Sequence, residues 1–203
     1  MSSFQAIHDE IENIIKELKK KHHFTSQGVR IDRVAKMAKE ELGSDFLACV
    51  NPEDVQWWLK QMKPRQMIIT QTSMKKKEVN HAIPIVCEKN ADSGAYYVFE
   101  PKPIFSETDY FYILPTSKMK LVERDPKWTP NVFFAFDTFS KYGKFGHNPQ
   151  PVLGHPFPEW FKYLFFVNKH PTQSEDTHDC AIRAVAWLKM YQKYGRLLIE
   201  LYF

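Results

Sequence analysis

The chain has 203 residues, of which 43% are hydrophobic and 26% are charged, and it contains 16 Phe, 9 Tyr and 5 Trp. This length and composition predict one folded domain with an aromatic-rich core, and they exclude a disordered chain. The net charge of +4 is mild, so it does not mark the surface as a whole for nucleic-acid binding.

Cysteine usage and hydropathy indicate the compartment. Cys49, Cys87 and Cys180 are too few and too scattered for a disulfide framework. The sequence has no run of about 18 apolar residues, and its N-terminus lacks the apolar core of a signal peptide. We therefore expect a soluble intracellular protein in a reducing setting, without a membrane partner.

Two amphipathic helices are predicted near the N-terminus. Apolar residues recur at three- and four-residue steps from Phe4 to Leu18, and again from Ile31 to Leu42, where Gly43 ends the pattern. Each helix therefore has one face that is expected to pack against the rest of the protein.

Basic runs follow the first helix and recur later in the chain. Residues 19–23 read KKKHH, and residues 75–77 read KKK. Such runs are able to meet a phosphate backbone, although a solvated helix end or loop is the plainer interpretation. The basic N-terminal region is therefore also a hypothetical docking site for an activating peptide or DNA.

A third helix and a series of short strands come next. In NPEDVQWWLKQM, Asn51 is predicted as the N-cap, Pro52 suits the first turn, and Pro64 closes the helix. Aromatic or β-branched runs between turn-forming residues then predict strands. These runs cover residues 66–71, 81–87, 95–100, 110–114, 120–123, 131–139 and 163–168. The ADSG sequence at 91–94 predicts a hairpin loop between two strands.

The last predicted element is a buried helix. The segment AIRAVAWLKMYQKY, which follows Cys180, carries apolar residues almost all the way round, so much of it is expected in the core. Helices, then strands, then a buried helix indicate an α+β fold.

Cys180 stands at the junction between a polar loop and this helix. At the first turn of a helix, unpaired backbone N–H groups and the positive end of the dipole stabilise a thiolate, which makes it a nucleophile at neutral pH. Asp179 is placed to serve as the N-cap. The backbone N–H of Cys180 points to where an acyl oxygen would sit.

Hydrolysis of an amide by this thiol also requires a general base, a group that orients the base, and a second donor for the oxyanion. His81 begins a predicted strand and Glu100 ends the next one, so the hairpin brings the carboxylate beside the imidazole. Gln173 lies seven residues before Cys180, within reach of the same point. The order is therefore His, Glu, Gln, Cys.

These residues resemble a known signature. The segments 81-HAIPIVCEKNADSGAYYVFEP-101 and 173-QSEDTHDC-180 are similar to the adenain-like cysteine proteases, a clan that includes viral maturation proteases and SUMO-deconjugating proteases. The resemblance implies a papain-like α+β fold of the adenain type, with a central mixed sheet flanked by helices. It covers residues 46–203, and residues 1–45 are expected to form an N-terminal helical extension.

The resemblance also implies a function. It points to a cysteine endopeptidase that cleaves viral capsid or core precursors during virion maturation, in the host cytoplasm or nucleus and in the virion. The implied catalytic residues are Cys180, His81, Glu100 and Gln173, with no metal or organic cofactor. A deconjugase that removes a ubiquitin-like modifier would use the same four residues, and a catalytically inactive binding module on the same fold is a further alternative.

Two residues depart from the family pattern, and the choice of the orienting acid stays open. Ala82 stands where the family usually has Trp, and Ala181 stands where it usually has Gly, but neither change removes a reacting atom. The sequence 133-FFAFDTFS-140 resembles the family's other acidic motif. Asp137 therefore competes with Glu100 for the role of orienting acid.

A zinc site is the competing interpretation of the same segment. His170, His178 and Cys180 lie close in the sequence, but their steps of eight and two residues do not match the paired short spacings of structural zinc modules. No base or acid motif accompanies Cys49 or Cys87, so both are interpreted as structural.

Overall fold

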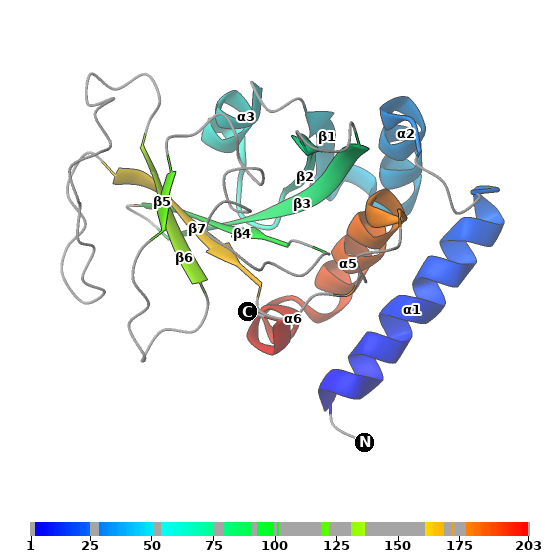
Figure 1. Ribbon diagram of the computed structural model, residues 1–203. Helices are drawn as coiled ribbons and strands as arrows, with labels where there is room; N and C mark the ends of the chain where they lie inside the picture. Colours follow the sequence, from blue (N-terminus) through cyan, green and yellow to red (C-terminus); the bar gives the residue numbers. More distant parts are fainter. Residues whose placement is uncertain are drawn as a thin grey trace.

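A mixed β-sheet forms the centre of the molecule (Figure 1). The structure is a computed structural model, and it describes residues 3–24, 29–50, 54–74, 79–90, 93–99, 101, 119–121, 131–136, 161–168, 172 and 178–202. Within these residues seven strands lie in the order β1-β2-β3-β4-β7-β6-β5. Their bounds are β1 Phe46–Val50, β2 Met67–Met74, β3 Val79–Asn90, β4 Ser93–Val98, β5 Met119–Leu121, β6 Asn131–Phe136 and β7 Phe161–Val167.

Helices flank this sheet, and the predicted α+β class is confirmed. β1 pairs with β2, and β4 with β7, in parallel, whereas the other neighbours are antiparallel. The helices are α1 Ser3–Lys21, α2 Ile31–Leu42, α3 Val55–Gln61, α5 Cys180–Tyr194 and α6 Arg196–Tyr202, with a short 3₁₀ turn η1 Gly43–Asp45. None of the helices in the described part of the chain combines the length and the apolar character needed to cross a bilayer.

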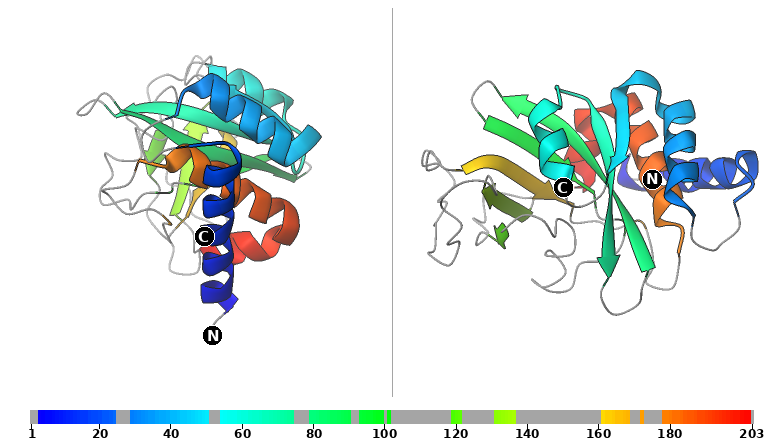
Figure 2. Two further views of the ribbon diagram at one scale, coloured as in Figure 1. Left: turned by 90° about the vertical axis from the view of Figure 1, so that its right-hand side faces the viewer. Right: turned by 90° about the horizontal axis from the view of Figure 1, so that it is seen from above.

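The two faces of the sheet bury different side chains, because side chains alternate along a strand. Ile83, Ile85 and Cys87 belong to a cluster that includes the buried residues of α3. Ala82 and Val86 belong to a cluster with α1, α2, α5 and α6. In the left view of Figure 2, α1 stands in front of α5 and α6 and below α2. The residue that follows the predicted base therefore faces the predicted nucleophile helix.

The predicted buried helix is confirmed as α5. Every side chain from Cys180 to Leu188 is buried. The ring of Trp187 stacks on Phe99, with 4.5 Å between the centroids. Fully burying one large apolar side chain contributes about 2 kcal/mol, so α5 anchors the core, and the position of its first residue is fixed by packing along the whole helix.

The N-terminal helices share this core. Their apolar stripes, predicted from periodicity, are buried against α5 and α6. α2 ends at Gly43, as predicted, and Gly43 has a positive φ of 68°, which glycine adopts readily. The boundary at residue 45 stays a prediction about how far the family resemblance extends. In the structure, α1 and α2 pack into one hydrophobic cluster with the chain that follows.

Several elements differ from the sequence prediction. The strand β1 was not predicted, because its five residues, FLACV, are all apolar and show no alternation with polar residues. The short helix α6 was not predicted either. The helix α3 begins at Val55 with Asp54 at its N-cap, rather than at Asn51, and an acidic residue there still complements the helix dipole. The predicted hairpin is confirmed by the pairing of Asn90 with Ser93, but Ser93 and Gly94 belong to β4 rather than to the predicted loop at 91–94. The predicted strand at 110–114 lies outside the described residues.

Candidate active site

Several chain segments converge at one end of the sheet. The strands β4 and β7 are parallel, so their carboxyl ends at Val98 and Val167 lie side by side. The strand β3 runs antiparallel to β4, and at this end the Phe99 N–H donates to the Pro84 carbonyl at 3.0 Å. The helix α5 places its first residue, Cys180, against β3 at the same end. Loops that leave parallel strands at one edge are the usual place for a binding site.

Cys180 is the first residue of α5, as predicted, and it is 8% exposed. The backbone N–H of Ala82 donates to its sulfur at 3.4 Å. This bond joins the start of α5 to β3. Because bond lengths place a Cα about 2.4 Å from the next amide nitrogen, the Cα of His81 lies within about 6 Å of the Cys180 sulfur.

Asp179 occupies the N-cap position of α5, but it does not form the predicted capping bond. Its Oδ1 accepts a hydrogen bond from Arg183 Nε and its Oδ2 accepts one from Lys19 Nζ, each at 2.7 Å. Burial raises the pKa of this carboxyl, but the bonds from Lys19 and Arg183 outweigh burial and hold the pKa below its usual value. Both oxygens face cations, so the first-turn N–H groups of α5 are left to other acceptors.

Arg183 is a buried cation that connects this carboxylate to two other segments. Its Nη1 donates to the Thr172 carbonyl and to the Glu12 carboxylate, each at 2.5 Å. The Thr172 N–H in turn donates to the Pro101 carbonyl at 3.0 Å. One guanidinium therefore ties the start of α5 to the segment after β7 and, through it, to the segment after β4.

The sequence neighbours of all four predicted residues take part in these bonds. They are Ala82 after His81, Pro101 after Glu100, Thr172 before Gln173, and Asp179 before Cys180. The structure thus joins residues that adjoin the predicted positions in sequence. Glu100, Gln173 and the side chain of His81 lie outside the described residues.

The competing acid, Asp137, also lies outside them, but the strand before it is described. Asn131, the first residue of β6, pairs with Val167 at the end of the sheet near Cys180. Phe136, the last residue of β6, pairs with Phe161 at the other end. At about 3.4 Å per residue, these two ends of β6 are about 17 Å apart. The chain therefore leaves β6 towards Asp137 at the end of the sheet remote from the thiol.

The other two cysteines have different surroundings. Burial raises the pKa of the Cys49 thiol to about 12. Cys87 lies in the core, and its thiol donates to the Met62 carbonyl at 3.7 Å. Neither stands at a helix N-terminus, which supports the structural interpretation. Among the residues that the structure describes, no group of three His, Cys, Asp or Glu side chains is placed to hold a metal ion, and His170 lies outside them.

Comparison with family models, with curated proteins and with solved structures found no match to this chain. The site is therefore interpreted from its own geometry and from the sequence resemblance. Sequence reasoning missed Arg183 and its partners on α1. The available signal was a single arginine inside the apolar segment AIRAVAWL, because a charged residue on a buried helix requires a charged or hydrogen-bonded partner.

Proposed function

We propose that this protein is a cysteine endopeptidase of the adenain type that cleaves protein precursors during virion maturation. The observation that carries the proposal is the hydrogen bond from the Ala82 N–H to the Cys180 sulfur, because it joins residues 98 positions apart and brings a helix-start thiol to the strand that carries His81. The adenain-type fold, the viral setting and the precursor substrates come from the sequence resemblance.

In the proposed mechanism, His81 takes the proton from Cys180, and the thiolate attacks the scissile carbonyl carbon. The Cys180 N–H and the side-chain amide of Gln173 hold the oxyanion. His81 then protonates the leaving amine, and it later activates the water that hydrolyses the thioester. Glu100 fixes the imidazole tautomer and stabilises the imidazolium. The mechanism requires no metal or organic cofactor.

The pairing of strands favours Glu100 over Asp137 as the orienting acid. Glu100 lies in sequence between Phe99, which bonds to the Pro84 carbonyl, and Pro101, whose carbonyl accepts from Thr172. Both neighbours belong to the end of the sheet where Cys180 lies. Asp137 follows a strand that ends at the opposite end. We therefore expect Glu100→Gln to lower kcat by about 10³-fold or more and Asp137→Asn to leave it unchanged.

The proposal is tested with peptides that carry small residues, Gly above all, at the cleavage position, since the resemblance points to such sites. Cys180→Ala and His81→Ala are each expected to abolish cleavage, a loss of about 10³-fold or more. Cys49→Ala is the matched control, because it removes a thiol outside the site. Circular dichroism and thermal melting establish that each variant is folded. Cleavage that survives Cys180→Ala contradicts the proposal.

Two further substrates separate the alternatives. Release of a ubiquitin-like modifier from a conjugate, with the peptides left intact, would assign a deconjugase. An inactive binding module would process neither substrate, and His81→Ala would leave the rate at which iodoacetamide alkylates Cys180 unchanged. The proposed enzyme cleaves the peptides and shows His81-dependent alkylation.

A further inference from the structure

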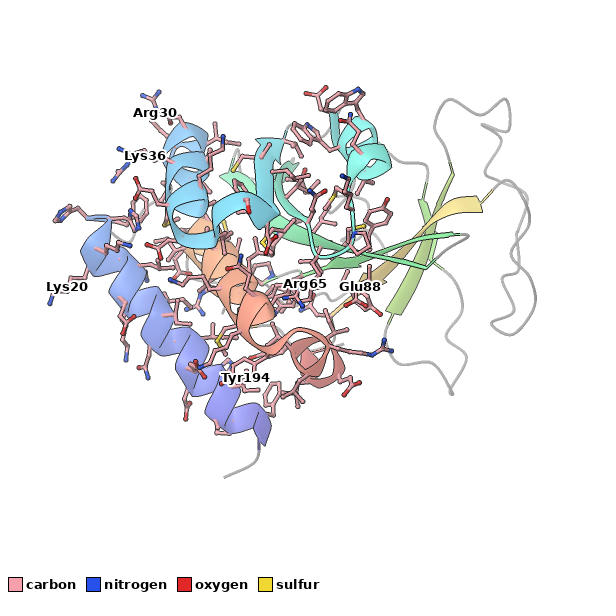
Figure 3. The ribbon with its side chains drawn as sticks, turned by 180° about the vertical axis from the view of Figure 1, so that it is seen from behind. Lys20, Arg30, Lys36, Arg65, Glu88 and Tyr194 are labelled. Atoms are coloured by element: carbon pink, nitrogen blue, oxygen red, sulfur yellow. The ribbon has the colours of Figure 1, made fainter. Side chains whose placement is uncertain are left out.

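Two side chains of α1 reach the start of α5. Glu12 binds Arg183, and Lys19 binds Asp179. Glu12 and Lys19 are seven residues apart, so they lie on the same side of the helix, about two turns from each other. Figure 3 shows α1 beside α5, with Lys20 marking the C-terminal end of α1 and Tyr194 lying at the end of α5 away from Cys180.

The four side chains form an alternating chain of charges, from Glu12 through Arg183 and Asp179 to Lys19. The inner pair is 9% and 5% exposed, whereas the outer side chains are 34% and 33% exposed. A buried ion pair is held in one geometry only when further hydrogen bonds satisfy its remaining oxygens and donors. The two residues of α1 supply such bonds, one to each member of the inner pair.

The inner pair also holds the backbone around the candidate site. Asp179 immediately precedes Cys180, and the Nη1 of Arg183 is shared between Glu12 and the Thr172 carbonyl. Thr172 immediately precedes Gln173. A rotation of the guanidinium that follows the loss of Glu12 would therefore change its bond to the segment that carries the second oxyanion donor.

We propose that α1 is a positioning element of this site, in which Glu12 and Lys19 fix Arg183 and Asp179 and thereby the backbone at Thr172 and at the start of α5. The inference rests on the proposed function for its activity measurement. Glu12 and Lys19 are positioning residues, because they act through Asp179 and Arg183.

The same helix provides matched controls. Glu10 binds Lys193 and Tyr194 at the other end of α5, and Lys21 binds Glu41 of α2. Glu10→Gln therefore removes the same charge as Glu12→Gln, from the same helix, without touching the cluster beside Cys180. Lys21→Met is the equivalent control for Lys19→Met.

The experiment measures kcat and KM of the full-length variants on the cleaved peptide. Positioning predicts that Glu12→Gln and Lys19→Met each lower kcat by about 10-fold or more with little change in KM, because small misplacements of reacting groups are costly. The controls are expected to keep the kcat of the parent protein, and Lys19→Arg is expected to restore most of the loss. The inference is overturned if the test variants keep the kcat of the parent protein. It is also overturned if the test and control variants lose the same factor in kcat.

The rate of Cys180 alkylation by iodoacetamide, followed by peptide mass spectrometry across pH, gives a second measurement. Glu12→Gln and Lys19→Met change the local charge in opposite directions. A purely through-space effect on Cys180 would therefore shift the pH of half-maximal alkylation in opposite directions in the two variants, and would leave their plateau rates equal to that of the parent protein. That outcome overturns the inference. Positioning instead predicts a severalfold higher plateau rate in both variants, because the loosened backbone exposes the thiol.

The alkylation plateau also separates the two proposals. If the parent protein cleaves no peptide, the proposed function fails, and the plateau rates alone decide whether α1 orders the backbone around Cys180. If Glu12→Gln does not fold, the comparison of Lys19→Met with Lys19→Arg still decides the test.

Discussion

The two ends of α5 carry ion pairs that differ in burial. At the N-terminal end, Arg183 and Asp179 are 9% and 5% exposed. At the C-terminal end, Lys193 and its partner Glu10 on α1 are 58% and 32% exposed. Charges interact more strongly in a low dielectric, but each also loses more hydration there. Burial, rather than the presence of an ion pair, is therefore expected to decide how much the stability of the protein depends on that pair.

Breaking the buried end is expected to have the largest effect. Arg183→Met removes the partner of Oδ1 of Asp179 and leaves the carboxylate buried with Lys19 alone. We expect the free energy of unfolding to fall by about 3–5 kcal/mol, as for other buried pairs that lose one member. Urea unfolding followed by circular dichroism measures this loss.

A second variant checks the reason for that loss. In the double variant Arg183→Met, Asp179→Asn, the uncompensated charge is gone, so part of the lost stability is expected to return. A double variant less stable than the sum of the single variants would show that the cost does not arise from the stranded carboxylate.

Glu41 combines features of both ends, because its side chain is 5% exposed whereas its partners Lys189 and Lys21 are 33% and 61% exposed. It is buried on α2 and accepts hydrogen bonds or ion pairs from Lys189 of α5, from Lys21 and from His22. Burial raises the pKa of its carboxyl, but the bonds from these three partners outweigh burial and lower the pKa to about 2. Its charge therefore contributes stability that is fully present above about pH 4.5 and is lost as the pH falls towards 2.

The corresponding prediction is a pH-dependent loss of stability when the Glu41 carboxylate is removed. Glu41→Gln is expected to lower the free energy of unfolding at pH 7 by on the order of 1–2 kcal/mol, because the cations that it leaves are able to reach water. The difference from the parent protein is expected to shrink towards zero near pH 2. Urea unfolding at both pH values measures it, and an equal difference at both would contradict a role for the carboxylate charge.

The elements that sequence predicts best are those whose signal is local. The apolar stripes of α1 and α2 and the all-round apolar surface of α5 follow from 3.6-residue periodicity. The place of Cys180 at a helix start follows from the change from polar loop to apolar helix. The strand β1 carries no such signal, because its five residues are all apolar and lack the alternation that marks a half-exposed strand.

The charged cluster beside the thiol could not be predicted from local sequence patterns. Lys19 and Asp179 are 160 residues apart, and Glu12 and Arg183 are 171 residues apart. The family resemblance does not reach residues 1–45, yet α1 supplies both outer charges. Only the packing of α1 along α5 brings these residues together, so the partners of Arg183 depend on the tertiary fold.

The exposed end of α5 is expected to show the smallest effect. Glu10→Gln removes a carboxylate whose pKa is lowered chiefly by the hydrogen bond from Lys193, and Gln keeps an oxygen that can accept from the Tyr194 hydroxyl. Solvent and salt screen this pair, and Lys193 loses little hydration by forming it. We expect no measurable change in urea unfolding at pH 7, in low or in high salt. A loss as large as that of Glu41→Gln would mean that exposure does not weaken the pair, and burial would then no longer explain why the two ends of α5 differ.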